Sequence, residues 1–283
     1  MINGIFGKKI IGNMKIFVLG YGGMLGRYVS KYLSTKYDVV EVGRSDFDAS
    51  DMCGVGFPQF FTGKVKKGDV VINCIGTIKP RVDELGIKNA LIVNSLFPHT
   101  LSTYCEQYGV ELIHPTTDCV FTGKKGQYTE VDEHDVTDIY GRTKSLGEPK
   151  NCTLIRTSII GEELKTSRSL VEWIKSEKNN TVFGYTNHNW NGVTCLQFAK
   201  ICHELIEKNL LWKGCKHVFS PTSYTKKELV ESISKHYDLN ITVTPKTTEE
   251  KCDRTLNTVS NIKSLISIPE LEVQIEEMKN FKL

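Results

Sequence analysis

The sequence lacks the features that would indicate a membrane, secreted or metal-bound protein. No window approaches the roughly 18 consecutive apolar residues of a membrane span. The first thirteen residues lack the unbroken apolar core of a signal peptide. The nine cysteines form no CxxC pair and no Cys/His cluster at zinc-ligand spacing. We therefore expect a cytoplasmic protein with reduced thiols, no membrane association and no metal ligand set.

The chain also lacks an excess of one charge. It has 36 Lys and Arg against 33 Asp and Glu, a formal net charge of +3. Proteins that bind nucleic acid polymers usually carry a marked basic patch, so that class is not expected. No repeat or low-complexity stretch is present, and 283 residues with 40% hydrophobic content suit one large α/β domain or a domain with a smaller partner.

Short apolar runs alternate with amphipathic segments from residue 14 onward. The amphipathic segments have helical spacing, as in Leu25, Tyr28, Val29 and Leu33. Alternating strands and helices predict a doubly wound parallel sheet in an α/β fold. The predicted strands are 15–19, 38–42, 69–73, 111–114, 153–157 and a last one at 217–221.

A glycine-rich turn follows the first predicted strand and opens the first predicted helix. Gly20, Gly23 and Gly26 have the spacing at which one glycine permits a sharp turn, another lets backbone N–H groups approach a pyrophosphate, and the last allows close helix packing. Such turns often only connect elements, so the strand and helix on either side carry the prediction. The predicted dinucleotide contacts are Gly20, Gly22, Gly23, Met24, Leu25 and Gly26.

The residues after the second predicted strand favour NADPH over NADH. An acid there usually binds the ribose diol of NAD, whereas a basic residue accommodates the extra phosphate of NADP. Gly43 and Arg44 occupy these positions, and Arg44 offers bidentate geometry to a phosphate. Glu41 or Asp46 is the alternative ribose ligand, so NADH stays open.

A candidate acid–base group spans two elements. Thr117 follows a predicted strand, while Tyr140 and Lys144 are four residues apart and share one helical face. The Lys144 charge, together with a bound nicotinamide, is expected to lower the phenol pKa from about 10. Thr117 is placed to hydrogen-bond the phenol. A YxxxK pattern alone is common in helices, but its order after the glycine turn and the Thr-bearing strand predicts a proton-transfer site.

Together these motifs resemble an extended short-chain dehydrogenase/reductase, specifically the dTDP-4-dehydrorhamnose reductase family. The resemblance implies that Tyr140 is the proton donor, that Lys144 binds the nicotinamide ribose and tunes Tyr140, and that Thr117 assists. Cys74, Ile75 and Gly76 would contact the cofactor. The segments that carry the resemblance are GYGGMLGR (20–27), VINCIGT (71–77), IVNSLFP (92–98), HPTTDCVFTGKKGQYTE (114–130), YGRTKSLGE (140–148) and LIRTS (154–158).

The resemblance implies an activity and leaves two alternatives. The activity is NAD(P)H-dependent reduction of the 4-keto group of a nucleotide-linked 4-keto-6-deoxyhexose, of the dTDP- or UDP-4-dehydrorhamnose type or an acetamido analogue. One alternative is a bifunctional 3,5-epimerase/4-reductase. The other is a non-catalytic NADP-binding regulatory subunit of the methionine adenosyltransferase type. A homodimer is the default expectation for oligomeric state.

The chain departs from the family pattern where the sugar is expected to bind. Cys119 stands in place of the usual Tyr, and only the final Thr of 187–194 matches the expected substrate stretch. The predicted substrate contacts are Thr117, Asp118, Asn189, Trp190 and Arg254, with His188 as a further candidate. Core packing is the alternative for Trp190, and a surface position is the alternative for Arg254.

These motifs divide the chain into three parts. Residues 1–13 are predicted to be an N-terminal extension, and 14–160 an NAD(P)-binding Rossmann domain. Residues 161–283 are predicted to form mainly a smaller substrate-binding lobe, with a strand near 216–220 returning to the sheet.

Overall fold

The computed structural model of the protein describes residues 14–51, 56–164 and 169–283. The predicted N-terminal extension, 1–13, lies outside these ranges. Within them, no helix has both the length and the apolar character needed to cross a membrane.

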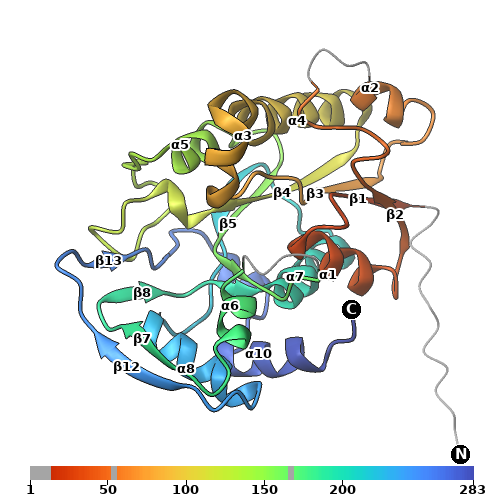
Figure 1. Ribbon diagram of the computed structural model, residues 1–283. Helices are drawn as coiled ribbons and strands as arrows, with labels where there is room; N and C mark the ends of the chain where they lie inside the picture. Colours follow the sequence, from red (N-terminus) through yellow and green to blue (C-terminus); the bar gives the residue numbers. More distant parts are fainter. Residues whose placement is uncertain (1–13, 52–55, 165–168) are drawn as a thin grey trace, which may run out of the picture.

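A six-stranded parallel sheet forms the centre of the fold, in the order β10-β5-β4-β3-β1-β2 (Figure 1). Its inner strands are nearly continuous apolar runs, as expected where helices cover both faces. The predicted α/β fold is therefore confirmed. The strands are β1 (Lys15–Leu19), β2 (Asp38–Val42), β3 (Val70–Asn73), β4 (Glu111–Thr117), β5 (Thr153–Thr157) and β10 (Gly214–His217).

The strand order reverses at β1. Phe17 of β1 pairs with Val40 of β2 on one side and with Val71 of β3 on the other, so the chain crosses the sheet between β2 and β3. In open parallel sheets, ligands bind outside the carboxyl ends of the strands at such a switch point. The topology therefore places a crevice beyond Leu19 and Asn73.

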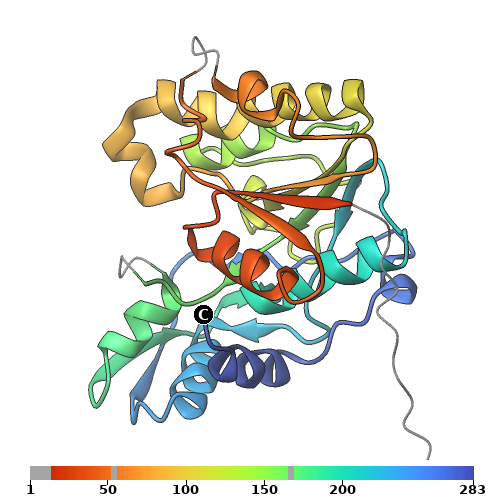
Figure 2. The same ribbon diagram turned by 90° about the vertical axis from the view of Figure 1, so that its right-hand side faces the viewer.

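Helices cover both faces of the sheet (Figures 1 and 2). On one face α1 lies against α7, and their apolar side chains, such as Val29 and Phe198, share one buried cluster with β1 and β3. The other helices lie on the opposite face, where Phe61, Phe97 and Leu101 pack on the sheet. The helices are α1 (Met24–Leu33) and α7 (Cys195–Glu207) on the first face, and α2 (Gly56–Phe61), α3 (Lys79–Leu91), η1 (Ile92–Leu96), α4 (Phe97–Tyr108) and α5 (Ile139–Leu146) on the second.

A smaller lobe lies beyond the α1 and α7 layer (Figure 2). Its core joins Trp190, Leu229 and Ile275 from three separate segments. Its elements are α6 (Leu170–Ser176), β7 (Thr181–Tyr185), β8 (His188–Trp190), β11 (Tyr224–Thr225), α8 (Lys226–His236), β12 (Thr242–Lys246), β13 (Cys252–Asp253) and α10 (Leu271–Asn280), and short connecting elements are η2 (Asp118–Val120), β6 (Ile159–Ile160), β9 (Val193–Thr194) and α9 (Ile262–Leu265).

The last strand of the main sheet differs from its prediction. It was expected at 217–221, but β10 begins at Gly214 and ends at His217. The ladder stops because Ser220 donates its N–H to the carbonyl of Asn191, and Pro221 has no N–H to donate. The strand still pairs in parallel with β5, through Cys215 opposite Leu154.

The glycine turn holds β1 and α1 in contact. Gly20 has φ +73°, and its carbonyl oxygen lies 2.2 Å from the position a Cβ on Gly26 would occupy. Any side chain at Gly26 therefore forces the helix away from the strand. Gly22 is different, because no atom lies within 4 Å of its Cβ position.

We predict that Gly26→Ala lowers the free energy of unfolding by about 1–3 kcal/mol, the usual cost of overpacking. Urea unfolding followed by circular dichroism measures this change. Gly22→Ala is the matched control and is expected to leave stability nearly unchanged. Equal stability of the two variants would contradict the close contact.

Candidate active site

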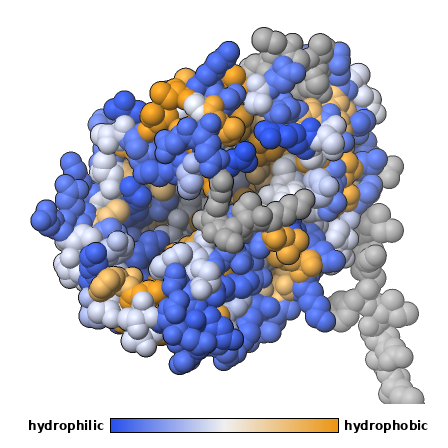
Figure 3. Space-filling model, in the orientation of Figure 1, coloured by the Kyte–Doolittle hydropathy of each residue, from blue (hydrophilic) through white to orange (hydrophobic). Residues whose placement is uncertain are grey.

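A cleft of about 880 Å³ opens at the carboxyl ends of β1, β3 and β4. Figure 3 shows the surface hollowed between the two halves of the molecule. The cleft brings together most residues of the two predicted sites. Those that line it are Gly22, Gly23, Met24, Leu25, Cys74, Ile75, Gly76, Thr117, Asp118, Tyr140 and Lys144.

The start of α1 fits the diphosphate of a dinucleotide. Within the described residues, Gly23 caps the helix without a side-chain hydrogen bond, and the first turn holds no acid. Its N–H groups and the positive end of the helix dipole thus face the cleft. Arg27 also lines the cleft, and its buried Nη1 has no hydrogen-bond partner among the residues that the structure describes. Arg27 was not predicted, although it directly follows the glycine motif.

Three predicted cofactor residues do not line the cleft. Gly20 and Gly26 instead contact each other inside the turn. Arg44 lies just past the end of β2, and its side chain is 69% exposed with Nε 3.1 Å from Asp48 Oδ2. The turn is tied to this strand end, because Gly20 donates its N–H to the Val42 carbonyl at 2.8 Å.

The helix α5 carries Tyr140 and Lys144 to the cleft. Asp138 caps the helix by accepting the Gly141 N–H at 3.0 Å. A Cβ on Gly141 would lie 2.4 Å from the Cys119 carbonyl, so α5 packs directly on the turn after β4. In that turn the Thr117 hydroxyl accepts the Cys119 N–H at 3.1 Å. The close packing is what places Thr117 beside Tyr140.

The protonation of Tyr140 is set by its burial. Burial raises the pKa of Tyr140, and the nearby Cys119 and Asp118 raise it further, while the hydrogen bond with Thr117 lowers it. Burial also lowers the pKa of Lys144 to about 8. In the chain alone, burial thus outweighs any lowering of the Tyr140 pKa, and the lowering by Lys144 together with a bound nicotinamide stays a prediction. The phenol carries its proton at neutral pH, which is the state a proton donor needs.

A buried charge network supports the end of β4. Glu148 accepts Arg156 Nη2 at 2.6 Å and the Thr116 hydroxyl at 2.9 Å. Arg156 also donates to His217 Nε2 at 2.6 Å and to His134 Nε2 at 2.7 Å. Because the guanidinium only donates, both imidazoles accept and are neutral. The network fixes Thr116, and with it Thr117, relative to α5.

Asn94 is a structural residue of the site that sequence reasoning missed. Its buried amide accepts the Thr77 N–H at 2.8 Å and donates to the Thr77 carbonyl at 3.0 Å. It also donates to Thr143 of α5 at 3.2 Å. Asn94 thereby ties α5 to the loop after β3 that lines the cleft. The IVNSLFP segment contained it, but no spacing singled it out.

The predicted substrate residues separate into two groups. Arg254 lies beside the cleft, where its Nε donates to the Phe121 carbonyl at 2.9 Å and its Nη1 is 3.8 Å from Cys119 Sγ. Burial raises the pKa of Asp118, while the Arg254 charge lowers it. Asn189 instead donates to Asp253 at 2.9 Å, and Trp190 is 3% exposed.

The placement of Asn189 and Trp190 follows from strand alternation. Successive residues of β8 point to opposite faces. Asn189 therefore turns toward Asp253, while Trp190 enters the core of the C-terminal lobe. For Trp190 the structure supports the core alternative rather than a wall of the cleft. His188 stacks on Tyr185 and hydrogen-bonds Thr248 at 2.9 Å.

A family model described as the RmlD substrate binding domain matches residues 14–255. The chain belongs to this RmlD family. It is 27% identical over 217 residues to a dTDP-4-dehydrorhamnose reductase of Aggregatibacter actinomycetemcomitans, covering 72% of the chain and 71% of that relative. A dTDP-4-dehydrorhamnose reductase of Mycolicibacterium smegmatis is 34% identical over 137 residues, covering 47% of the chain and 40% of the relative.

The solved structures agree on the fold of this RmlD family member. A dTDP-4-dehydrorhamnose reductase of Bacillus anthracis in complex with NADP superposes with a TM-score of 0.79 at 20% identity. The match covers 95% of this chain and 99% of that one. The shared fold thus includes the C-terminal lobe.

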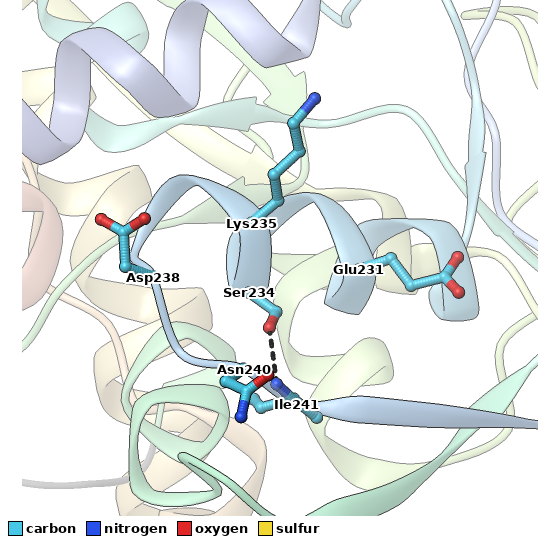
Figure 4. A pocket seen from close by; sticks show the side chains of 6 residues that line it. All are labelled: Glu231, Ser234, Lys235, Asp238, Asn240 and Ile241. Atoms are coloured by element: carbon cyan, nitrogen blue, oxygen red, sulfur yellow. Dashed lines mark hydrogen bonds between the residues drawn. The ribbon is translucent and has the colours of Figure 1, made fainter.

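A second hollow of this RmlD family member lies on α8, away from the cleft. Figure 4 shows that its polar side chains diverge, with the Glu231 and Asp238 carboxylates at opposite ends and Lys235 pointing away. The Ser234 hydroxyl already accepts a hydrogen bond from the Ile241 N–H at 3.2 Å. Without converging groups, this hollow has no arrangement that would orient a ligand.

We predict that acid destabilises the protein through His217. Burial and the Arg156 charge lower the pKa of His217 to about 4, against about 6.5 for an unfolded histidine. As the pH falls, the unfolded state binds this proton first, so the stability present above pH about 6.5 is lost progressively toward pH about 4. Urea unfolding at several pH values measures the decline.

In the variant His217→Gln the decline is expected to be shallower, because the titrating group is gone. The variant is also expected to be less stable at neutral pH, since its hydrogen bond with Arg156 is altered. An equally steep decline in the two proteins would contradict the assignment to His217.

Proposed function

We propose that the chain is an NAD(P)H-dependent reductase of the 4-keto group of a nucleotide-linked 4-keto-6-deoxyhexose. The substrate is of the dTDP- or UDP-4-dehydrorhamnose type or an acetamido analogue. The observation that carries the proposal is that Thr117, Tyr140 and Lys144 meet the glycine turn in one cleft. Membership of the RmlD family and the reductase relatives support it.

The residues divide the chemistry between them. A bound reduced nicotinamide supplies the hydride to the carbonyl carbon. Tyr140 donates its proton to the carbonyl oxygen as negative charge develops there. Thr117 hydrogen-bonds the phenol and stabilises the phenolate that remains. Lys144, four residues along the same helix, adds its positive charge to the buried site.

The charged groups near the end of β2 favour NADPH. The two acids that could bind the ribose of NADH already accept hydrogen bonds within the chain. Glu41 accepts the Ser30 hydroxyl, and Asp46 accepts the Gly43 N–H at 2.8 Å. Among the described residues, Arg44 pairs with Asp48 of its own loop, in an exposed contact that contributes little. A phosphate on the adenosine ribose would bind Arg44 more strongly than this carboxylate does.

We predict that Tyr140→Phe lowers kcat by about 10²–10⁴, the usual contribution of a positioned proton donor. Loss of reduced-nicotinamide absorbance measures turnover with 4-keto-6-deoxyhexoses linked to dTDP or UDP, in 3,5-epimerised and non-epimerised forms. NADPH binding by the variant is the control for an intact fold. If the wild type reduces only the non-epimerised substrate, the bifunctional alternative is supported. Undiminished turnover by the variant would contradict the role of Tyr140.

We further predict that Arg44→Ser weakens NADPH binding by roughly tenfold or more, the equivalent of a lost hydrogen bond between charged groups. NADH binding is expected to stay the same, because NADH has no ribose phosphate. Fluorescence titration of the reduced nicotinamide measures both affinities. An equal loss of affinity for the two cofactors would show that Arg44 does not bind the ribose phosphate.

A further inference from the structure

Asp118 is a buried acid of the cleft that the proposed chemistry leaves unused. It lines the cleft beside Thr117 and is 4% exposed. The Thr117 hydroxyl donates to its Oδ1 at 3.2 Å. Among the described residues Asp118 forms no ion pair, unlike Asp138, which lies 3.3 Å from Lys79 Nζ. An unpaired carboxylate is costly to remove from water, so this position favours the protonated acid.

The charged and titratable groups that face Asp118 come from several elements. Arg254 directly follows β13, and Lys226 is the first residue of α8. Burial raises the pKa of Asp118, and this effect outweighs the charges of Arg254 and Lys226, which lower it. Cys119 of the same turn and Tyr140 of α5 are neutral, because burial raises the pKa of each. The surroundings therefore agree with a protonated Asp118.

Thr117 has one hydroxyl proton to share between two neighbours. Its oxygen accepts the Cys119 N–H at 3.1 Å, and the hydroxyl also hydrogen-bonds Asp118 and Tyr140. A hydroxyl donates once and accepts twice. When Asp118 is ionised, it takes the Thr117 proton, and the phenol then donates its own proton to Thr117. When Asp118 is protonated, it donates to Thr117, whose proton is then free to bond the phenol oxygen.

We propose that Asp118 is a positioning residue that acts in its protonated form, an inference that rests on the proposed function. Its O–H donates to Thr117, and Thr117 donates to the Tyr140 oxygen, so the phenol proton points at the substrate carbonyl. As Tyr140 gives up this proton, the bond from Thr117 becomes one to a charged oxygen and strengthens. Asp118 keeps its own proton throughout. Carboxylic acids that burial keeps neutral serve as hydrogen-bond donors in other active sites.

The test compares the pH dependence of kcat in wild type, Asp118→Asn and Asp135→Asn. Asn cannot ionise, so its effect on Thr117 does not change with pH. The ratio of kcat in Asp118→Asn to kcat in wild type is therefore expected to rise by about tenfold or more between pH 5 and 9. Asp135→Asn is the matched control, because Asp135 also accepts a threonine hydroxyl, that of Thr122, but lies outside the cleft lining. Its ratio to wild type is expected to stay constant.

Infrared spectroscopy supplies a second readout that needs no substrate. The difference spectrum between wild type and Asp118→Asn is expected to contain the C=O stretch of one protonated carboxyl. This band is expected to shift in Thr117→Val, where the hydrogen bond is lost, and to disappear over the pH range in which the kcat ratio rises. Asp118→Leu, which also cannot ionise, serves if Asp118→Asn does not fold.

The outcomes separate this inference from the proposed function. If 4-keto sugars are reduced but the kcat ratio is constant, the proposed function stands and the role of Asp118 is overturned. Absence of the carboxyl band, or a band unaffected by Thr117→Val, also overturns it. If no 4-keto sugar is reduced but the band is present and shifts in Thr117→Val, the proposed function fails and the bond from Asp118 to Thr117 is supported.

Discussion

The buried contact of Arg156 with Glu148 is the constraint on which the site depends. A guanidinium removed from water needs hydrogen-bond partners, and each of the three Arg156 nitrogens donates to a carboxylate or to one of two neutral imidazoles. Those partners come from the segment after α5, the loop before it, and the end of β10. The charge therefore joins the strand end that holds Thr117 to the helix that holds Tyr140.

Around this fixed centre, the cleft has two different electrostatic ends. On the cofactor side, positive potential comes from the N-terminus of α1 and from the buried guanidinium of Arg27. Near Asp118 and Cys119, it comes from Arg254. Between them lie Tyr140 and a buried Asp118, whose pKa values are raised. Burial thus keeps the phenol of the proton donor neutral.

The sequence was informative where local pattern determines structure. The glycine turn, the parallel strands and the YxxxK helix each depend on spacing within a few residues, and all but the last strand are present close to their predicted positions. Trp190 was harder to place, because the same strand pattern fits a wall or a core position. Asn94 was missed because it matters through contacts with distant segments, which no local periodicity indicates. Arg27 was missed because its place in the cleft depends on the tertiary fold.

The C-terminal part of the chain supplies elements to the nucleotide-binding half, and this has a consequence for biosynthesis. Both α7 and β10 come from beyond residue 161, yet α7 covers the apolar face of α1 and β10 completes the sheet beside β5. During translation, the first 160 residues emerge with the apolar face of α1 uncovered by α7 and the β5 edge of the sheet unpaired. Burial of this surface waits until about sixty more residues have been made, so folding of the nucleotide-binding half is necessarily coupled to synthesis of the second half.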